Sequence, residues 1–219
     1  MAEDRWHDVY ESQGRRWGDL PGALAPIAVA RMLDPSSPAP AGAVLDIGCG
    51  YGRDSVYLAR ELGRKVMGID PAPSAIELAR SSAPTDLELE FRRVTIDQLE
   101  GETFAAVYCS NTYHIMRPPE REAVQRAVGR LLVPGGLFFF AALALGDPEH
   151  WDAGVPVAGD ADSYLDAEGY LHFSAPASLE RDFGGSLTIE RTWEHEFVEP
   201  LAGGDQHHHL HVMLVARKP

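Results

Sequence analysis

Short apolar runs alternate with amphipathic stretches through the middle of the chain. The apolar runs are short enough to be buried strands, and glycine or proline often stands at their ends. They predict strands at about residues 43–47, 65–69, 87–94, 104–109 and 137–145. Helices are predicted between them at about residues 53–62, 74–80 and 118–132. Because strands and helices alternate, we expect a doubly wound, mostly parallel sheet.

The first forty residues follow a different pattern. Residues 4–33 predict two helices, separated by a break at residues 18–21 (Gly-Asp-Leu-Pro). A linker rich in Pro, Ser and Ala follows at residues 35–42. We therefore expect a helical extension before the sheet.

The chain also changes character after the last predicted parallel strand. Residues 146–175 lose regular periodicity, which in a compact domain is more often functional than accidental. A short helix is predicted at residues 176–183. Two alternating runs, at about residues 186–198 and 207–217, then predict an antiparallel hairpin.

Composition narrows the class of protein. At 219 residues the chain is long enough for one well-buried domain. Its net charge of −14 disfavours a nucleic-acid partner, because such a field repels phosphates. The absence of a membrane-length apolar run and of a signal-peptide pattern favours a protein outside the membrane. Only two cysteines, Cys49 and Cys109, argue against a disulfide framework and favour the cytoplasm.

The strongest chemical signal is a glycine-rich turn after the first predicted strand. Residues 44–55 read Val-Leu-Asp-Ile-Gly-Cys-Gly-Tyr-Gly-Arg-Asp-Ser. The glycines allow the backbone to turn tightly and to approach a ligand without a Cβ in the way. A second acid, Asp70, ends the next apolar run and can accept hydrogen bonds from both hydroxyls of a ribose. The arrangement predicts a site for a cofactor that contains adenosine, built from Asp46, Gly48, Gly50, Gly52 and Asp70.

The spacing of the glycines distinguishes between cofactors. A dinucleotide site requires Gly-x-Gly-x-x-Gly, and the last glycine of that motif would fall at Arg53. The third glycine of this chain is Gly52 instead. This spacing suits a cofactor that has no pyrophosphate to place at a helix N-terminus. A nicotinamide-dependent oxidoreductase is the alternative.

An acid followed by Gly-x-Gly-x-Gly resembles the first motif of the class I S-adenosylmethionine-dependent methyltransferases. Residues 131–136 (Leu-Leu-Val-Pro-Gly-Gly) resemble the turn into the fifth strand of that family, and the predicted hairpin resembles its last two strands. Trp6, Tyr10 and Trp17 resemble the small-molecule branch that includes tellurite-resistance-type and thiopurine-type enzymes. The resemblance implies a Rossmann-like, doubly wound α/β fold. Its seven-stranded sheet would be mostly parallel with an antiparallel last strand, and an N-terminal helical extension would precede it.

The same resemblance implies methyl transfer from S-adenosylmethionine to a small-molecule acceptor. Residues 1–40 would form an extension that covers the active site, and residues 41–219 the cofactor-binding domain. The family's adenine-binding acid falls at Thr95, so either Thr95 or Asp97 takes that role, and Ile96 supplies an apolar face or a backbone amide. The implied cofactor contacts are Asp46, Gly48, Gly50, Gly52, Asp70, Ile96, Asp97 and Ser110.

Residues 110–116 (Ser-Asn-Thr-Tyr-His-Ile-Met) follow the fourth predicted strand, where ligands of open α/β sheets bind. The resemblance places the backbone near Cys109 and Ser110 against the methionine part of the cofactor. Tyr113 and His114 then face the acceptor as the catalytic candidates. His114 can serve as the base that a hydroxyl or amine acceptor needs, whereas a thiolate or a reduced metalloid needs none. The other interpretation is a polar loop whose His114 caps a neighbouring helix.

A run of histidines, His-His-His-Leu-His at residues 207–211, begins the last predicted strand. Because side chains alternate along a strand, His207, His209 and His211 share one face, beside the carboxyl ends of the parallel strands. Three interpretations stay open: a polar pocket lining, a metal site, or an incidental surface. Alternate strand residues lie about 6.5–7 Å apart, so one ion would need more ligands, for which residues 194–196 (Glu-His-Glu) are available. We assign no metal site from the sequence.

The remaining expectations concern partners and alternatives. His172 is a further pocket candidate, whereas His7 and His150 carry no signal. The expected partner is a small-molecule methyl acceptor, without nucleic acid or membrane, and the protein is expected to be a monomer or homodimer. Besides the oxidoreductase, the alternative is a non-catalytic protein that senses a metal or ligand through its terminal histidines.

Overall fold

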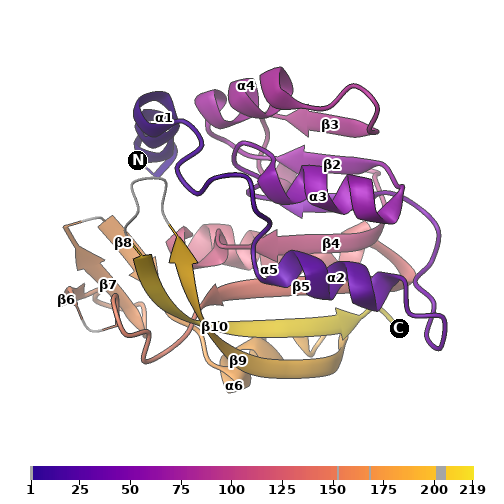
Figure 1. Cartoon of the computed structure of the whole chain (residues 1–219). Helices are drawn as coiled ribbons and strands as arrows, with labels where there is room; N and C mark the ends of the chain where they lie inside the picture. Colours follow the sequence, from indigo (N-terminus) through magenta and orange to yellow (C-terminus); the bar gives the residue numbers. More distant parts are fainter. Residues whose placement is uncertain (1, 152, 168, 201–205) are drawn as a thin grey trace.

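The computed structural model describes residues 2–151, 153–167, 169–200 and 206–219. Seven strands form the main sheet: β1 (Val44–Ile47), β2 (Val66–Ile69), β3 (Leu89–Arg92), β4 (Phe104–Ser110), β5 (Leu132–Leu143), β9 (Thr188–Pro200) and β10 (Gln206–Arg217). Their order is β3-β2-β1-β4-β5-β10-β9 (Figure 1). β1 is parallel to β2 and β4, whereas β10 lies antiparallel between β5 and β9. The predicted Rossmann-like sheet with its inserted antiparallel strand is confirmed.

Helices cover both faces of the sheet: α1 (Ala2–Gln13), α2 (Leu24–Met32), α3 (Arg53–Leu62), α4 (Pro73–Ser82), α5 (Pro118–Leu131) and α6 (Pro176–Phe183). The apolar side chains of α2 and α3 pack on one face, and those of α5 and α6 pack on the other. Two short 3₁₀ helices, Ile96–Gln98 and Tyr113–Ile115, follow β3 and β4. None of the helices in the described part of the chain is long and apolar enough to cross a membrane.

The alternation of side chains along β5 and β10 builds these two cores. On β5, Phe138 and Phe140 lie in the core with α5 and α6, whereas Phe139 lies in the core with α2 and α3. On β10, Leu214 joins the first core and Met213 the second. Full burial of side chains of this size contributes about 1.5–3 kcal/mol each. The odd-numbered residues of β10 therefore point to the side of the sheet that α2 and α3 cover. His207, His209 and His211 point to that same side.

Glycine defines the ends of α3. Gly52 (φ 81°) precedes the helix, and Gly63 (φ 59°) ends it in the left-handed conformation common after helices. The predicted bounds of the helices at 53–62 and 176–183 are confirmed by α3 and α6. By contrast, residues 133–136 are not a turn that precedes a strand. They lie within β5 and interrupt its pairing with β4, which passes from Leu132 directly to Leu137.

The sequence predicted an irregular segment at residues 146–175, and this prediction is wrong. They contain a three-stranded antiparallel sheet of β6 (Val155–Pro156), β7 (Ser163–Asp166) and β8 (Gly169–His172). Residues 152 and 168 of this segment lie outside the described residues. Figure 1 shows the small sheet near the carboxyl ends of the parallel strands, the same end of the molecule as α1.

A partly buried polar cluster joins the small sheet to α5. Arg121 Nη2 donates to Asp160 Oδ1 at 2.6 Å, and the Tyr170 hydroxyl donates to Asp160 Oδ2 at 2.5 Å. The Arg117 guanidinium lies 4.3 Å from the centre of the Tyr170 ring. These contacts hold the segment between β5 and α6 against the body of the domain.

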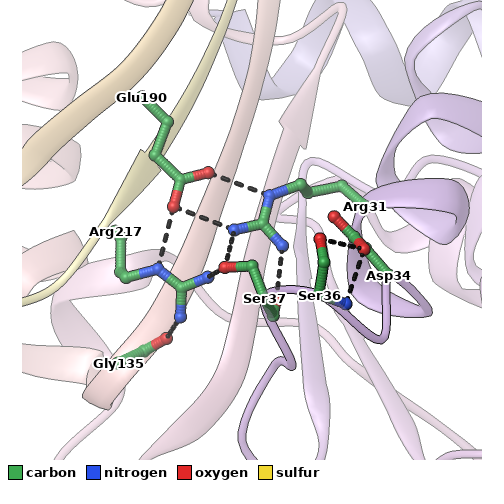
Figure 2. Close-up of polar contacts among 7 residues, drawn as sticks. All are labelled: Arg31, Asp34, Ser36, Ser37, Gly135, Glu190 and Arg217. Carbon is green, nitrogen blue, oxygen red and sulfur yellow. Dashed lines mark hydrogen bonds and ion pairs between the residues drawn. The ribbon is translucent and has the colours of Figure 1, made fainter.

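An ion-pair network closes the opposite end of the sheet (Figure 2). Glu190 on β9 accepts hydrogen bonds from Arg31 Nε and Nη2 at 2.9 Å and from Arg217 Nε at 2.8 Å. Ser37 Oγ accepts from both guanidinium groups, at 3.1 and 3.0 Å. Burial opposes ionisation of Glu190, but the hydrogen bonds outweigh it and hold the pKa of that carboxyl below its ordinary value. The network links the end of α2 to the last two strands.

Candidate active site

A cavity of about 570 Å³ opens at the carboxyl ends of the parallel strands, a size typical of small-molecule sites. Its walls come from α1 and the loop after it, the turn after β1, the segments after β2, β3 and β4, and the start of β10. In open α/β sheets this edge binds ligands. Seven of the eight cofactor contacts implied by the resemblance line it: Asp46, Gly48, Gly50, Asp70, Ile96, Asp97 and Ser110.

Gly48 and Gly50 make the close backbone approach possible. Both lie in the left-handed region, with φ of 67° and 54°, where other residues are strained. A Cβ at Gly48 would stand 2.2 Å from Thr112 Oγ1, and one at Gly50 would stand 2.5 Å from the Tyr10 hydroxyl oxygen. The turn can therefore keep this conformation and pack against Thr112 and Tyr10 only without side chains at these positions.

Gly52 departs from the prediction, because it does not line the cavity. A Cβ at Gly52 would stand 2.7 Å from Cζ of Phe91 on β3. The residue thus allows the turn to pack closely on the neighbouring strand. We correct its role from cofactor contact to packing.

Asp70 presents a buried carboxylate to the cavity. Its Oδ2 accepts a hydrogen bond from the Gly50 backbone N–H at 3.0 Å, and its Oδ1 accepts from the Ala72 N–H at 2.9 Å. Burial raises the pKa of Asp70 to about 6, against the opposing effect of these two hydrogen bonds. Each oxygen has lone-pair capacity left for a further donor, so the carboxylate is suited to a ribose diol.

Asp46 is a second buried acid at the base of the same cavity. Ser55 Oγ donates to Asp46 Oδ2 at 2.5 Å. Burial raises the pKa of Asp46 to about 8, with a further contribution from the charges of Asp54 and Asp70. A cationic group placed beside Asp46 would favour its ionised form.

The segment after β3 holds all three adenine candidates at the cavity wall. Thr95, Ile96 and Asp97 each line it. The backbone N–H and the hydroxyl of Thr95 both donate to Gln98 Oε1, at 2.8 and 3.2 Å. Ile96 is buried, whereas Asp97 is exposed. The hydroxyl proton of Thr95 is thus engaged with Gln98, while Asp97 is an exposed residue of the cavity wall.

Of the two catalytic candidates, His114 lines the cavity and Tyr113 does not. Tyr113 is fully buried, and its ring packs against Phe140 with centroids 5.0 Å apart. Its hydroxyl accepts from Gln125 Nε2 at 2.8 Å and donates to Asp182 Oδ2 at 3.3 Å. Successive residues of a 3₁₀ helix point about 120° apart, which lets Tyr113 enter the core while His114 faces the cavity. We correct Tyr113 from a catalytic to a core residue.

His114 is a neutral, weakly basic imidazole. Its Nδ1 is buried and has no hydrogen-bond partner among the described residues. Burial, together with the charges of His209 and His150, lowers the pKa of His114 to about 3. Such a ring can accept a hydrogen bond at neutral pH but is a poor proton acceptor, since an effective base has a pKa near the working pH.

The histidine face of β10 forms the far wall of the cavity. His207, His209 and His211 all line it, as the alternation predicted. His211 pairs with Leu143 at the carboxyl end of β5. His208 points the other way, and its Nε2 lies 2.9 Å from Glu196 Oε1. The interpretation as an incidental surface is therefore wrong.

The neighbouring strand offers fewer ligands than the sequence suggested. In the β9–β10 register, His195 pairs with His211, and it shares the histidine face. Glu194 pairs with Val212, which lies in the core with α5 and α6, so this acid is on the opposite face. Glu196 also lies on that face, beside His208.

Sequence reasoning missed His150 and misplaced His172. His150, in the loop after β5, lines the cavity, and its ring stacks on that of His209 with centroids 5.4 Å apart. The loop has no periodicity that could have indicated this contact. His172 lines a second, smaller cavity instead, where its Nδ1 is 2.9 Å from Ser163 Oγ.

An aromatic cluster from the N-terminal segment closes the cavity above the glycine turn. Trp6, Tyr10 and Trp17 line it. The Trp6 ring lies 6.0 Å from that of Tyr10 and 5.9 Å from that of Trp17. Ser74 Oγ donates to the His7 carbonyl at 2.9 Å and so attaches α1 to α4.

This combination of fold and site is that of the class I S-adenosylmethionine-dependent methyltransferases. Residues 44–136, from β1 into the interruption of β5, match the family model described as a methyltransferase domain. Over these residues the chain is therefore similar to the methyltransferase domains of this class, whose cofactor is S-adenosylmethionine.

Curated relatives extend this similarity. The chain is 34% identical over 146 residues to the ubiquinone biosynthesis O-methyltransferase of Xanthomonas axonopodis pv. citri (strain 306), covering 62% of this chain and 59% of that protein. It is 42% identical over 104 residues to the protein of the same name from Methylocella silvestris, covering 46% and 39%. The chain thus spans at most about three fifths of the length of these relatives.

Solved structures share the fold across the whole chain. A structure described as "Conversion of a Disulfide Bond into a Thioacetal Group during Echinomycin Biosynthesis" has a TM-score of 0.74 at 23% identity, covering 100% of this chain and 92% of that one. Magnesium protoporphyrin IX methyltransferase from Synechocystis PCC 6803 with bound S-adenosylmethionine has a TM-score of 0.64 at 17% identity, covering 100% and 98%.

The raised pKa of Asp70 predicts how cofactor binding depends on pH. Affinity for S-adenosylhomocysteine is expected to fall about tenfold between pH 7 and pH 5, because a carboxyl with a pKa of about 6 becomes protonated over this range and loses acceptor capacity. An ordinary aspartate, with a pKa of about 3.9, would stay ionised. Calorimetric titrations across the range measure the fall. Asp70→Asn cannot ionise, so the same fall in this variant would contradict the assignment.

Proposed function

We propose that the protein transfers a methyl group from S-adenosylmethionine to a hydroxyl group of a small molecule. The observation that carries the proposal is the division of one cavity into two chemically different ends. One end has the glycine turn and Asp70, and the other has His114 and the odd-numbered histidines of β10. A cofactor and an acceptor can therefore lie end to end.

The first end suits S-adenosylmethionine. Asp70 would accept from both ribose hydroxyls, and Gly48 and Gly50 would admit the methionine part beside the backbone. Ile96 and Asp97 would bind the adenine, and Ser110 would lie by the methionine end. Asp46 would be the partner of a cationic group, because a positive charge stabilises its ionised form.

The second end suits a polar acceptor held in line with the methyl group. The hydroxyl oxygen would form a bond to the methyl carbon as the carbon–sulfur bond breaks, and the electron pair of that bond would return to sulfur. The hydroxyl group would donate a hydrogen bond to His114, which orients the oxygen, and its proton would leave to water. Alignment of oxygen, methyl and sulfur supplies much of the rate enhancement. The curated relatives are named O-methyltransferases, which supports oxygen as the acceptor atom.

We propose that residues 1–40 act as the cover of this site. Residue 1 lies outside the described residues, but α1 and the loop after it contribute Trp6, Tyr10 and Trp17 to the cavity wall. α2 instead packs into the core with α3. A cover of this kind would exclude water from the reacting groups.

The expected setting of the reaction also stays a proposal. A net charge of −14 supports a small-molecule acceptor over a nucleic acid. Cys49 and Cys109 are free thiols, which supports a cytoplasmic location. We expect the protein to act as a monomer or homodimer.

Transfer of tritium from methyl-labelled S-adenosylmethionine to a panel of phenols, catechols, thiols and amines tests the proposal. At least one hydroxyl compound is expected to gain label well above an acceptor-free control. In His114→Ala the rate with that compound should fall at least tenfold, because the hydroxyl loses the acceptor that orients it, while affinity for S-adenosylhomocysteine changes less than twofold. Label on thiols or amines alone, or on none of the compounds, would contradict the proposal.

A further inference from the structure

Imidazoles from two separate parts of the chain converge at the acceptor end of the cavity. His150 comes from the loop after β5, and His207 and His209 come from β10. One donor nitrogen from each of the three lies within 4.8 Å of the other two. Nitrogen ligands of a tetrahedral Zn²⁺ ion, with Zn–N bonds of 2.0–2.1 Å, stand about 3.3–3.4 Å apart. Rotation of the histidine side chains about χ1 and χ2 can bring the three nitrogens to this spacing.

His150 supplies the ligand from a second element that the strand histidines need to hold one ion. Alternate residues of one strand lie about 6.5–7 Å apart at the backbone, so His207 and His209 need a third ligand from another element. The rings of these two histidines nevertheless approach to 5.6 Å between centroids. His150 lies against both, with centroids 6.3 Å from His207 and 5.4 Å from His209.

Two carboxylates from the His150 loop approach the strand histidines. Asp147 Oδ2 lies 3.5 Å from His209 Nδ1, and Glu149 Oε2 lies 3.7 Å from His207 Nδ1. A carboxylate at one ring nitrogen orients an imidazole and makes its other nitrogen a better metal ligand. With the carboxylates on the Nδ1 side, Nε2 would be the ligand nitrogen of both histidines.

The same carboxylates hold the loop against the strand. Asp147 Oδ1 accepts from the His150 backbone N–H at 2.9 Å, and its Oδ2 accepts from the Leu210 N–H at 2.8 Å. Glu149 Oε1 accepts from the His208 N–H. Asp147 is only 2% exposed. The loop and the strand are thus held in fixed relation before any ligand binds.

We propose that His150, His207 and His209 bind a divalent first-row transition metal ion such as Zn²⁺. Neutral imidazole is a preferred ligand of these ions, and the two nearby carboxylates add favourable negative charge. Three protein ligands leave a fourth coordination position, as in catalytic zinc sites. That position is open to the cavity that the three residues line.

The consequence for the acceptor rests on the proposed function. A hydroxyl group bound at the fourth position would lose its proton more readily, because a bound cation lowers the pKa of a coordinated oxygen. This would complement the weak basicity of His114. The favoured acceptors would then be those that offer a hydroxyl together with a second oxygen able to reach the ion.

Zinc titration of the whole protein, stripped of metal with EDTA, tests the site. Wild type is expected to bind one Zn²⁺ per chain with a Kd of about 1 µM or tighter. His150→Ala, His207→Ala and His209→Ala should each weaken binding about tenfold or more. His208→Ala is the matched control, since it removes a histidine of the same strand from the opposite face. Its zinc affinity should equal that of wild type.

Titration of each variant with S-adenosylhomocysteine shows whether the domain is intact. The absence of saturable zinc binding by wild type would overturn the metal site. An unchanged affinity in the triple variant of His150, His207 and His209 would do the same. Failure of the proposed function looks different: S-adenosylhomocysteine binding or methyl transfer is absent, whatever the zinc titration shows.

Discussion

Replacement of Asp70 with alanine is expected to weaken S-adenosylhomocysteine binding by a factor of about 10² to 10⁴. The carboxylate would accept from two ribose hydroxyls, and hydrogen bonds to charged groups contribute about 1.5–3 kcal/mol each. Loss of both costs about 3–6 kcal/mol, which corresponds to that range of Kd. Isothermal titration calorimetry measures the change directly. An affinity within threefold of wild type would remove Asp70 from the cofactor site.

Asp70 also accepts backbone hydrogen bonds, so its removal has to be separated from loss of folding. Without it the N–H groups of Gly50 and Ala72 lose their partner. Asp86→Ala removes the same charge from the exposed loop before β3, at the opposite edge of the sheet, and should bind the ligand as wild type does. Asp70→Asn keeps an acceptor for one of the two N–H groups and should still lose most of the affinity. Urea unfolding of all three variants measures the remaining stability.

Gly48→Ala is expected to reduce the free energy of unfolding by about 2–5 kcal/mol and to abolish detectable cofactor binding. A left-handed backbone costs alanine about 1–2 kcal/mol. Overpacking adds about 1–3 kcal/mol, because the new Cβ would stand 2.2 Å from Oγ1 and 2.5 Å from Cβ of Thr112. Thr112 is a short, buried side chain and cannot rotate out of the way. The turn must therefore move.

Gly63→Ala separates the two contributions. Gly63 has a similar φ of 59°, but a Cβ there would meet nothing within 4 Å. This variant should lose only about 1–2 kcal/mol and keep wild-type cofactor affinity. Insoluble Gly48→Ala beside soluble Gly63→Ala agrees with the account. Equal destabilisation of the two variants, with equal binding, would contradict it.

Local signals were sufficient to predict the main sheet. Apolar runs bounded by glycine or proline indicated the five parallel strands, and Gly63 ended α3 where the sequence placed its end. The small sheet could not be found in this way. β6 has two exposed residues, Val155 and Pro156, and so offers no alternation between buried and exposed positions. Its pairing with β7 depends on contacts made after the chain folds.

The cavity was predictable where one segment supplies several of its residues. The glycine turn and the alternating histidines are such cases, because spacing alone sets their direction. His150 is different, since Asp147 brings it to His209 by bonding to Leu210, 63 positions further along the chain. Tyr113 was misassigned because its neighbour His114 lines the cavity, while its own ring packs inside the core.

The most direct test of the central claim is a titration of wild type with S-adenosylhomocysteine, with NADH as the rival ligand. The account predicts saturable binding of one S-adenosylhomocysteine per chain, weakened about a hundredfold or more in Asp70→Ala, and no saturable binding of NADH. The glycine spacing, with Arg53 in place of the last dinucleotide glycine, is the reason for this preference. Binding of NADH without binding of S-adenosylhomocysteine would contradict the account.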